Sequence, residues 1–147
     1  MAHNKAFQEL ERQVEFAISQ RSNFCYETNF NTTPLYWPEH FKQSGYELDL
    51  IYLCLDSIDE AKHRVDIRVQ NGGHFVAESE IIKRYFDGFE NLDVNFKYFD
   101  QVHLFDASAY MEEPRHLLSM KNGDLIKQTY FPYYLSELLP NIFKKNK

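Results

Sequence analysis

The chain has 147 residues, of which 44% are apolar and 26% charged, and its formal net charge is −6. This composition is typical of one folded domain and excludes a disordered chain, and the negative charge argues against bulk attraction to nucleic acid or to an anionic membrane. No apolar run approaches the roughly 20 residues of a membrane span, and the first residues are polar and charged. We therefore expect a cytoplasmic protein without a membrane segment or a secretory signal.

The amino-terminal part predicts a helix followed by a strand. Apolar residues recur at spacings of three and four over about residues 4–20, which indicates an amphipathic helix. The short run at residues 22–27 (SNFCYE) is apolar in its middle and ends in a carboxylate, which favours a buried strand. Cys25 lies in this run and Cys54 in a later one, without a CxxC motif, so we expect both thiols to be reduced and buried.

A second helix and a second strand follow a polar loop. Pro34 and Pro38 mark the helix start, and Gly45 is a typical helix terminator. Residues 48–55 (LDLIYLCL) form a nearly continuous apolar run, as expected of a strand that is covered on both faces.

Two helices and a third strand come next. A capping-box pattern at residues 57–60 (SIDE) predicts a helix up to about Gln70, which an Asn-Gly-Gly stretch ends. A further apolar stripe predicts a helix over about residues 78–91, and residues 101–106 (QVHLFD) predict a core strand.

The remaining sequence predicts a hairpin and a closing helix. Asn122-Gly123 is a strong two-residue turn signal between runs at residues 116–120 and 125–129, and residues 133–143 are helical in pattern. Strands that alternate with helices predict an α/β fold with a mainly parallel sheet and helices on both faces, to which the hairpin and the last helix are added. We expect residues 1–147 to form a single domain.

Ligands of open parallel sheets bind beyond the carboxyl ends of the strands. Those ends carry Glu27 with Thr28 and Asn29, then Asp56, then Asp106. Glu27 is the most suggestive, because a carboxylate that closes an apolar strand is placed to accept a proton or to hold a hydroxyl. The alternative is that Glu27 caps the next helix or pairs with a core arginine.

Three of the six arginines fall within one short stretch. Arg64 and Arg68 lie four residues apart on one predicted helix, and Arg84 lies on the next, across a double-glycine hinge. Such helices could close a lid of guanidinium groups over phosphate oxygens. The alternative, which is stronger on periodicity alone, is that the arginines pair with neighbouring acids on a solvated face, namely Asp59, Glu60, Asp66 or Glu80.

Two stretches together resemble the zeta-toxin-like family of P-loop kinases: SNFCYETNF and GYELDLIYLCLDSIDEAKHRVDIRVQNGGHFVAESEIIKRYFDGFENL. In that family a strand ending in Glu-Thr precedes a helix, a Gly-Tyr pair leads into an apolar strand, and a helix with paired arginines precedes Gly-Gly-His-x-Val. The resemblance covers about residues 6–118. Its most specific part is the R-x-x-x-R-x-x-x-GGH-x-V block, which stands here in one continuous stretch.

The resemblance implies a P-loop-kinase type of fold and phosphoryl transfer from ATP with magnesium to a small hydroxyl compound, such as a nucleotide-activated amino sugar. By carry-over, residues 27–29 (Glu-Thr-Asn) would line the substrate side. Arg64, Arg68 and Arg84 would be the catalytic lid that neutralises the transferring phosphate oxygens.

One part of the family pattern is missing. The sequence contains no G-x-x-x-x-G-K-[ST] motif, and no lysine precedes a serine or a threonine. The backbone cradle for phosphate, its lysine and its magnesium-binding hydroxyl are therefore absent, and we expect no cofactor for this chain alone. The chain would be a fragment or a truncated homologue, inactive by itself.

Two functions follow from these observations. The first is the carboxyl-terminal part of a zeta-toxin-like kinase, whose partners would be a small hydroxyl substrate and an antitoxin-like protein. The second is a non-catalytic binding or assembly module that forms a homodimer through the sheet edge left open by the missing central strand.

Overall fold

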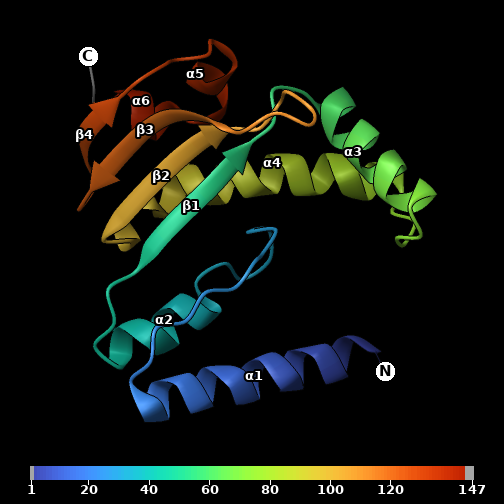
Figure 1. Ribbon diagram of the computed structural model, residues 1–147. Coiled ribbons are helices and arrows are strands. Elements are labelled where there is room, and N and C mark those ends of the chain that lie inside the picture. Colours follow the sequence, from blue (N-terminus) through green and yellow to red (C-terminus); the bar gives the residue numbers. More distant parts are fainter. Residues whose placement is uncertain (1, 145–147) are drawn as a thin grey trace.

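The computed structural model describes residues 2–144 and is a mixed α/β structure with one open four-stranded sheet (Figure 1). Its elements follow the chain as α1 (Ala2–Gln20), α2 (Tyr36–Gln43), β1 (Asp49–Cys54), α3 (Ile58–Gln70), α4 (Glu78–Asn95), the short 3-10 helix η1 (Phe96–Tyr98), β2 (Gln101–Asp106), β3 (Arg115–Lys121), β4 (Asp124–Gln128), α5 (Tyr134–Leu138) and α6 (Pro140–Lys144). Among these described residues, no helix is both long and apolar enough to cross a membrane.

The strand order is β1-β2-β3-β4, and only β1 and β2 are parallel. The expected α/β class is confirmed, but the sheet is not mainly parallel, because two of its three strand pairs are antiparallel. The reason is connection length: α3 and α4 provide the crossover that parallel strands need, whereas β2, β3 and β4 are joined by connections without a helix. The predicted hairpin is confirmed, with Asn122 and Gly123 at φ values of 52° and 80°.

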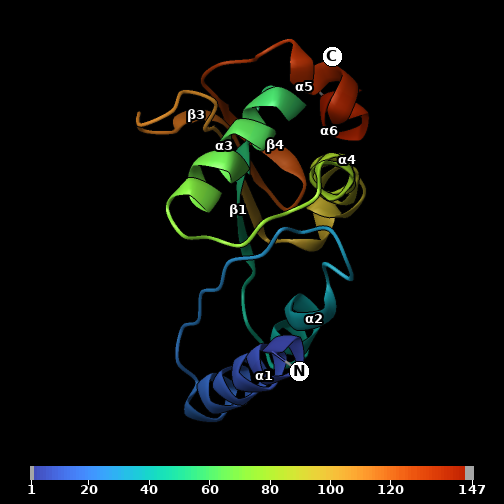
Figure 2. The ribbon, with the colours of Figure 1, turned by 90° about the vertical axis from the view of Figure 1, so that its right-hand side faces the viewer.

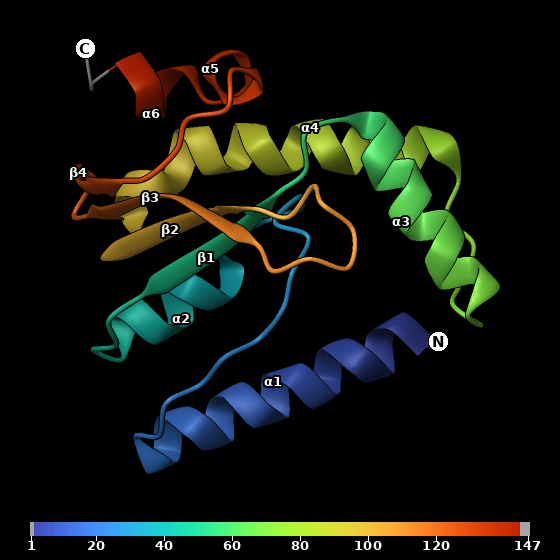
Figure 3. The same cartoon turned by 45° about the horizontal axis from the view of Figure 1, so that its top comes forward.

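One face of the sheet packs against helices. α4 crosses behind β1 and β2, and α5 and α6 lie beside α4 on the same side (Figure 3). Phe89 and Leu92 of α4 are buried in the core, and the Asp93 carboxylate accepts hydrogen bonds from the amides of Asn141 and Ile142, at 2.9 and 3.0 Å. These bonds satisfy amide groups at the start of α6 and hold it against α4.

The amino-terminal helices form a second layer of packing below the sheet (Figure 2). α1 buries Val14 and Ala17, and α2 buries Trp37 and Phe41. The Phe7 ring on α1 lies 5.4 Å from the Trp37 ring, centroid to centroid, so aromatic contacts join the two helices. The helix terminator predicted after α2 is confirmed, since Gly45 has a φ of 85°.

Four predictions of local structure are wrong. Residues 22–27 are extended but form no strand, because no neighbouring strand pairs with them. β1 is not covered on both faces, since the side chains of Ile51 and Leu53 are 64% and 56% exposed. Cys25 is exposed, whereas Cys54 is buried as predicted. The closing helix is divided into α5 and α6, because Pro140 cannot continue the preceding hydrogen-bond pattern.

Candidate functional site

The outer edge of β1 presents unpaired backbone groups. The Leu48 carbonyl accepts the amide of Gln101, and the Cys54 carbonyl accepts the amide of Ala107, so the even-numbered residues bond toward β2. Because successive residues of a strand direct their backbone groups to opposite sides, the N–H and C=O groups of residues 49, 51 and 53 point away from β2. β1 is an end strand of the sheet, so within residues 2–144 no strand pairs with this edge.

An extended segment runs alongside that edge. We call residues 22–30 the arm, which leads from α1 toward α2 and lies beside β1 (Figure 1). At its start, the Tyr46 hydroxyl donates to the Ser22 carbonyl over 3.0 Å. At its end, Phe30 is buried, and the Asn91 amide of α4 donates to the carbonyls of Phe30 and Asn31, over 2.9 and 2.7 Å.

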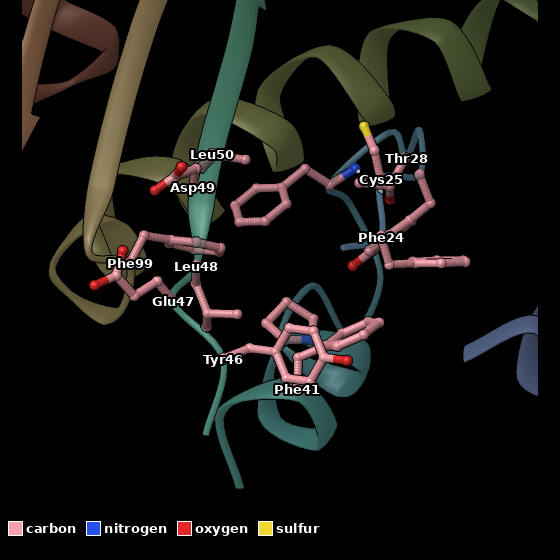
Figure 4. Close-up of a pocket in the computed structure, with 13 residues that line it drawn as sticks. Phe24, Cys25, Thr28, Phe41, Tyr46, Glu47, Leu48, Asp49, Leu50 and Phe99 are labelled. Carbon is pink, nitrogen blue, oxygen red and sulfur yellow. Dashed lines mark hydrogen bonds between the residues drawn. The ribbon is translucent and has the colours of Figure 1, made fainter. Parts of the chain in front are cut away.

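A groove separates the arm from β1, and we call it the β1 groove. Its middle is a cavity of about 150 Å³ between Phe24 and Thr28 of the arm and Leu48 and Leu50 at β1, with Phe41 of α2 at its base (Figure 4). The groove continues toward the carboxyl end of β1, where the lining residues are Cys25, Tyr26, Glu27, Thr28, Asn29, Phe30, Leu50, Ile51, Tyr52 and Leu53. At the opposite end it is lined by, among others, Arg21, Glu47 and Asp49.

The structure places all three predicted substrate residues in this groove. Glu27, Thr28 and Asn29 are exposed and line the groove together with residues 50–53 of β1. The Thr28 hydroxyl accepts the amide of Phe30 over 3.1 Å, which fixes the local turn. Within residues 2–144 the Glu27 carboxylate neither caps a helix nor pairs with an arginine, so it is available to a ligand.

The three predicted arginines lie outside the β1 groove. Arg64 pairs with Glu60 over 2.5 Å and donates to the Ala107 carbonyl over 2.7 Å, which ties α3 to the loop after β2. Arg84 pairs with Glu80 over 2.9 Å on its own helix. Both arginines therefore pair with a neighbouring acid, as the alternative interpretation of the sequence predicted.

Arg68 differs from the other two arginines. It is exposed, and among the described residues its guanidinium group has no ion-pair partner. Its side chain packs against the double-glycine bend, where a Cβ on Gly73 would lie 2.6 Å from the Arg68 Cγ. Glycine at position 73 is therefore required for the bend to approach this side chain.

Two residues that shape the groove were not predicted from the sequence. Asn91 anchors the arm, and Gly88 lets α4 approach Tyr52, since a Cβ at Gly88 would lie 2.6 Å from the Tyr52 hydroxyl and 3.4 Å from the Asn29 carbonyl. Burial raises the pKa of Tyr52, so the groove floor is uncharged at neutral pH. In the sequence, the close packing of α4 on Tyr52 is signalled locally by Gly88, a glycine within a predicted helix.

The comparisons with known proteins give no match. No protein-family model matches the chain, and no curated protein or solved structure matches it.

Proposed function

We propose that this protein is the substrate-side portion of a zeta-toxin-like phosphotransferase, which acts when a strand that carries a phosphate-binding loop is supplied to it. The observation that carries the proposal is the position of Glu27, Thr28 and Asn29 in the β1 groove, beside the free edge of β1. In a P-loop kinase the strand before the phosphate loop belongs to the sheet, and the unpaired edge of β1 supports the proposal because an added strand could pair with it.

The residues present do not fit ATP and magnesium without such a segment. The sequence lacks G-x-x-x-x-G-K-[ST], and within residues 2–144 no cluster of His, Cys, Asp and Glu side chains could hold a metal ion. What this chain contributes to the proposed reaction is therefore confined to substrate binding and charge neutralisation. Glu27 would accept a hydrogen bond from the hydroxyl group of the substrate, and Thr28 and Asn29 would position it.

The three arginines lie outside the β1 groove, so this role requires α3 and α4 to close toward the bound substrate as a lid. An exposed pair four residues apart on a helix contributes about 0.3–0.5 kcal/mol, whereas a hydrogen bond to a charged group contributes about 1.5–3 kcal/mol. A phosphate oxygen can therefore displace Glu80 from Arg84, which is 40% exposed. Arg64 is held more firmly by its two backbone acceptors, Ala107 and Ser108, and we assign it a positioning role.

The test joins a strand–G-x-x-x-x-G-K-T–helix unit to the amino end of the chain and measures phosphate transfer from ATP to a nucleotide-activated amino sugar. We expect transfer by the extended protein and at least about a tenfold loss of turnover in Arg68→Ala and in Arg84→Ala, because each removes a charge that the transferred group needs. Arg12→Ala is the matched control, since Arg12 makes a similar pair with Glu9 on α1. Unchanged turnover in both arginine variants would contradict the proposal, as would the absence of transfer.

The unmodified chain gives a second readout. Because it lacks a phosphate cradle, its melting temperature should not change with ATP and magnesium. A clear upward shift would show that the chain binds nucleotide by another route.

A non-catalytic binding or assembly module is the second candidate, and the exposure of Ile51 and Leu53 favours it. In this case neither nucleotide nor the added unit would produce transfer, while a partner chain would still bind at β1. A homodimer through this edge would appear as a concentration-dependent mass in sedimentation, and the Ile51→Lys variant would remove it.

A further inference from the structure

We propose that the β1 groove is a strand-acceptor site, which binds one extended apolar segment of a partner polypeptide through main-chain hydrogen bonds to β1. The proposal does not require phosphotransferase activity, since it concerns the edge of β1 and not the chemistry at residues 27–29. The proposal defines the partner segment by three properties: an extended conformation, apolar side chains and a positive charge at the ends.

The two edges of the sheet differ in their readiness to pair. The outer strand β4 carries Lys127, and its pairing with β3 is interrupted by a bulge at Ser119 and Met120, both of which are devices that discourage further pairing. Both edge strands carry exposed apolar residues, Ile126 on β4 and Ile51 and Leu53 on β1, but β1 pairs regularly with β2 along its whole length. An unprotected edge of this kind is a template for an added strand.

The arm determines what can occupy the groove. It lies beside β1 and closes the outer side of the groove (Figure 4). A second copy of the chain would bring its own β1 with β2 attached. A single extended segment has no such attachment and needs only the outward backbone groups of β1, to which residues 23–29 make no hydrogen bond.

The lining predicts the side chains of the partner. Leu50, Tyr52 and Phe30 form an apolar wall beneath the groove, so side chains that face α4 should be apolar. Charged residues line the ends: Glu27 at one, and Glu47, Asp49 and the single cation Arg21 at the other. The excess of carboxylates favours a partner segment with lysine or arginine at its ends.

The test uses a synthetic peptide of about six alternating valine and isoleucine residues between terminal lysines. Added to the full chain, it should slow hydrogen exchange of the Ile51 and Leu53 amides at least about tenfold, because these N–H groups point into the groove. It should also slow alkylation of Cys25, which is exposed in the groove, while buried Cys54 serves as the internal reference.

The matched control is the same peptide with an N-methyl group on every valine and isoleucine, which keeps the side chains but removes the main-chain donors on both edges of the segment. We expect it to protect neither amide nor Cys25. Equal protection by both peptides, protection of the Ile126 amide on β4 in place of Ile51, or no protection at saturating peptide would each overturn the proposal. Protection of Ile51 that rises with protein concentration in the absence of peptide would overturn it in favour of a second copy.

Discussion

At the scale of single residues, the close contact between α4 and β1 depends on Gly88. Its missing Cβ leaves room for the Tyr52 hydroxyl, at a distance of 2.6 Å from where that atom would be. A glycine inside a helix costs about 1 kcal/mol relative to alanine, so the chain gives up helix propensity at this position for close packing of the groove wall.

Gly88→Ala should therefore destabilise the protein. Overpacking costs about 1–3 kcal/mol, which exceeds the gain in helix propensity, and we expect a net loss of about 1–2 kcal/mol in the free energy of unfolding, measured by urea denaturation. Tyr52→Phe in the same chain should restore most of this loss, because it removes the atom that the new Cβ would meet. Glu90→Ala, at an exposed position of α4, reports the effect of helix propensity alone. A stabilised Gly88→Ala variant would contradict the argument.

At the scale of elements, β2 and β3 carry a chain of polar contacts. Ser119 lies between two imidazoles, with its hydroxyl 2.7 Å from the His103 Nδ1 and 2.8 Å from the His116 Nε2. The other ring nitrogen of His116 lies 2.7 Å from the Thr129 hydroxyl. Burial lowers the pKa of His116, with further contributions from Lys127 and His103.

This lowered pKa predicts a dependence of stability on pH. The unfolded state, with a histidine pKa of about 6.5, takes up the proton before the folded state does. Stability should thus be full above about pH 6.5 and should fall as the pH decreases toward the folded pKa. His116→Gln should weaken this dependence between about pH 7.5 and pH 5 in thermal unfolding, whereas His74→Gln, in an exposed loop, should not. An equal dependence in the wild type and in His116→Gln would refute the assignment.

Local signals predicted most elements well. Ser57 caps the predicted helix, since its hydroxyl accepts the Glu60 amide over 3.1 Å, and β2 has the predicted bounds. α4 extends four residues beyond the predicted end at Asn91 and includes Asp93. That extension depends on long-range contacts with α6, which sequence periodicity does not report.

At the scale of the whole molecule, the sheet layer and the amino-terminal layer meet along the arm. Asn91 is a specific link between them, because its amide donates to two carbonyls at the end of the arm. The backbone there is unusual, with positive φ values of 56° at Phe30 and 42° at Thr33. Such conformations persist only where the surroundings hold them.

Asn91→Ala should release the arm without unfolding the sheet. Two partly buried carbonyls would lose their donors, at a cost of about 1–3 kcal/mol, and the segment at residues 22–33 should be cleaved faster in limited proteolysis. Asn95→Ala is the matched control, since the Asn95 amide bonds to the Asn91 carbonyl within α4. Equal cleavage rates for the two variants would show that Asn91 does not hold the arm.

The sequence by itself predicted the first four α-helices, the hairpin and the two strands that pair in parallel, and it singled out Glu27, Thr28 and Asn29 as candidate ligand residues. Caps, turns and side-chain periodicity are local properties, and local energetics suffice to predict them. Only the tertiary structure decided that residues 22–27 form no strand, that β1 has a free edge and that the arginines lie away from the groove. A strand exists only with a partner, and side chains meet only where packing brings their elements together, so these features depend on contacts between distant parts of the chain.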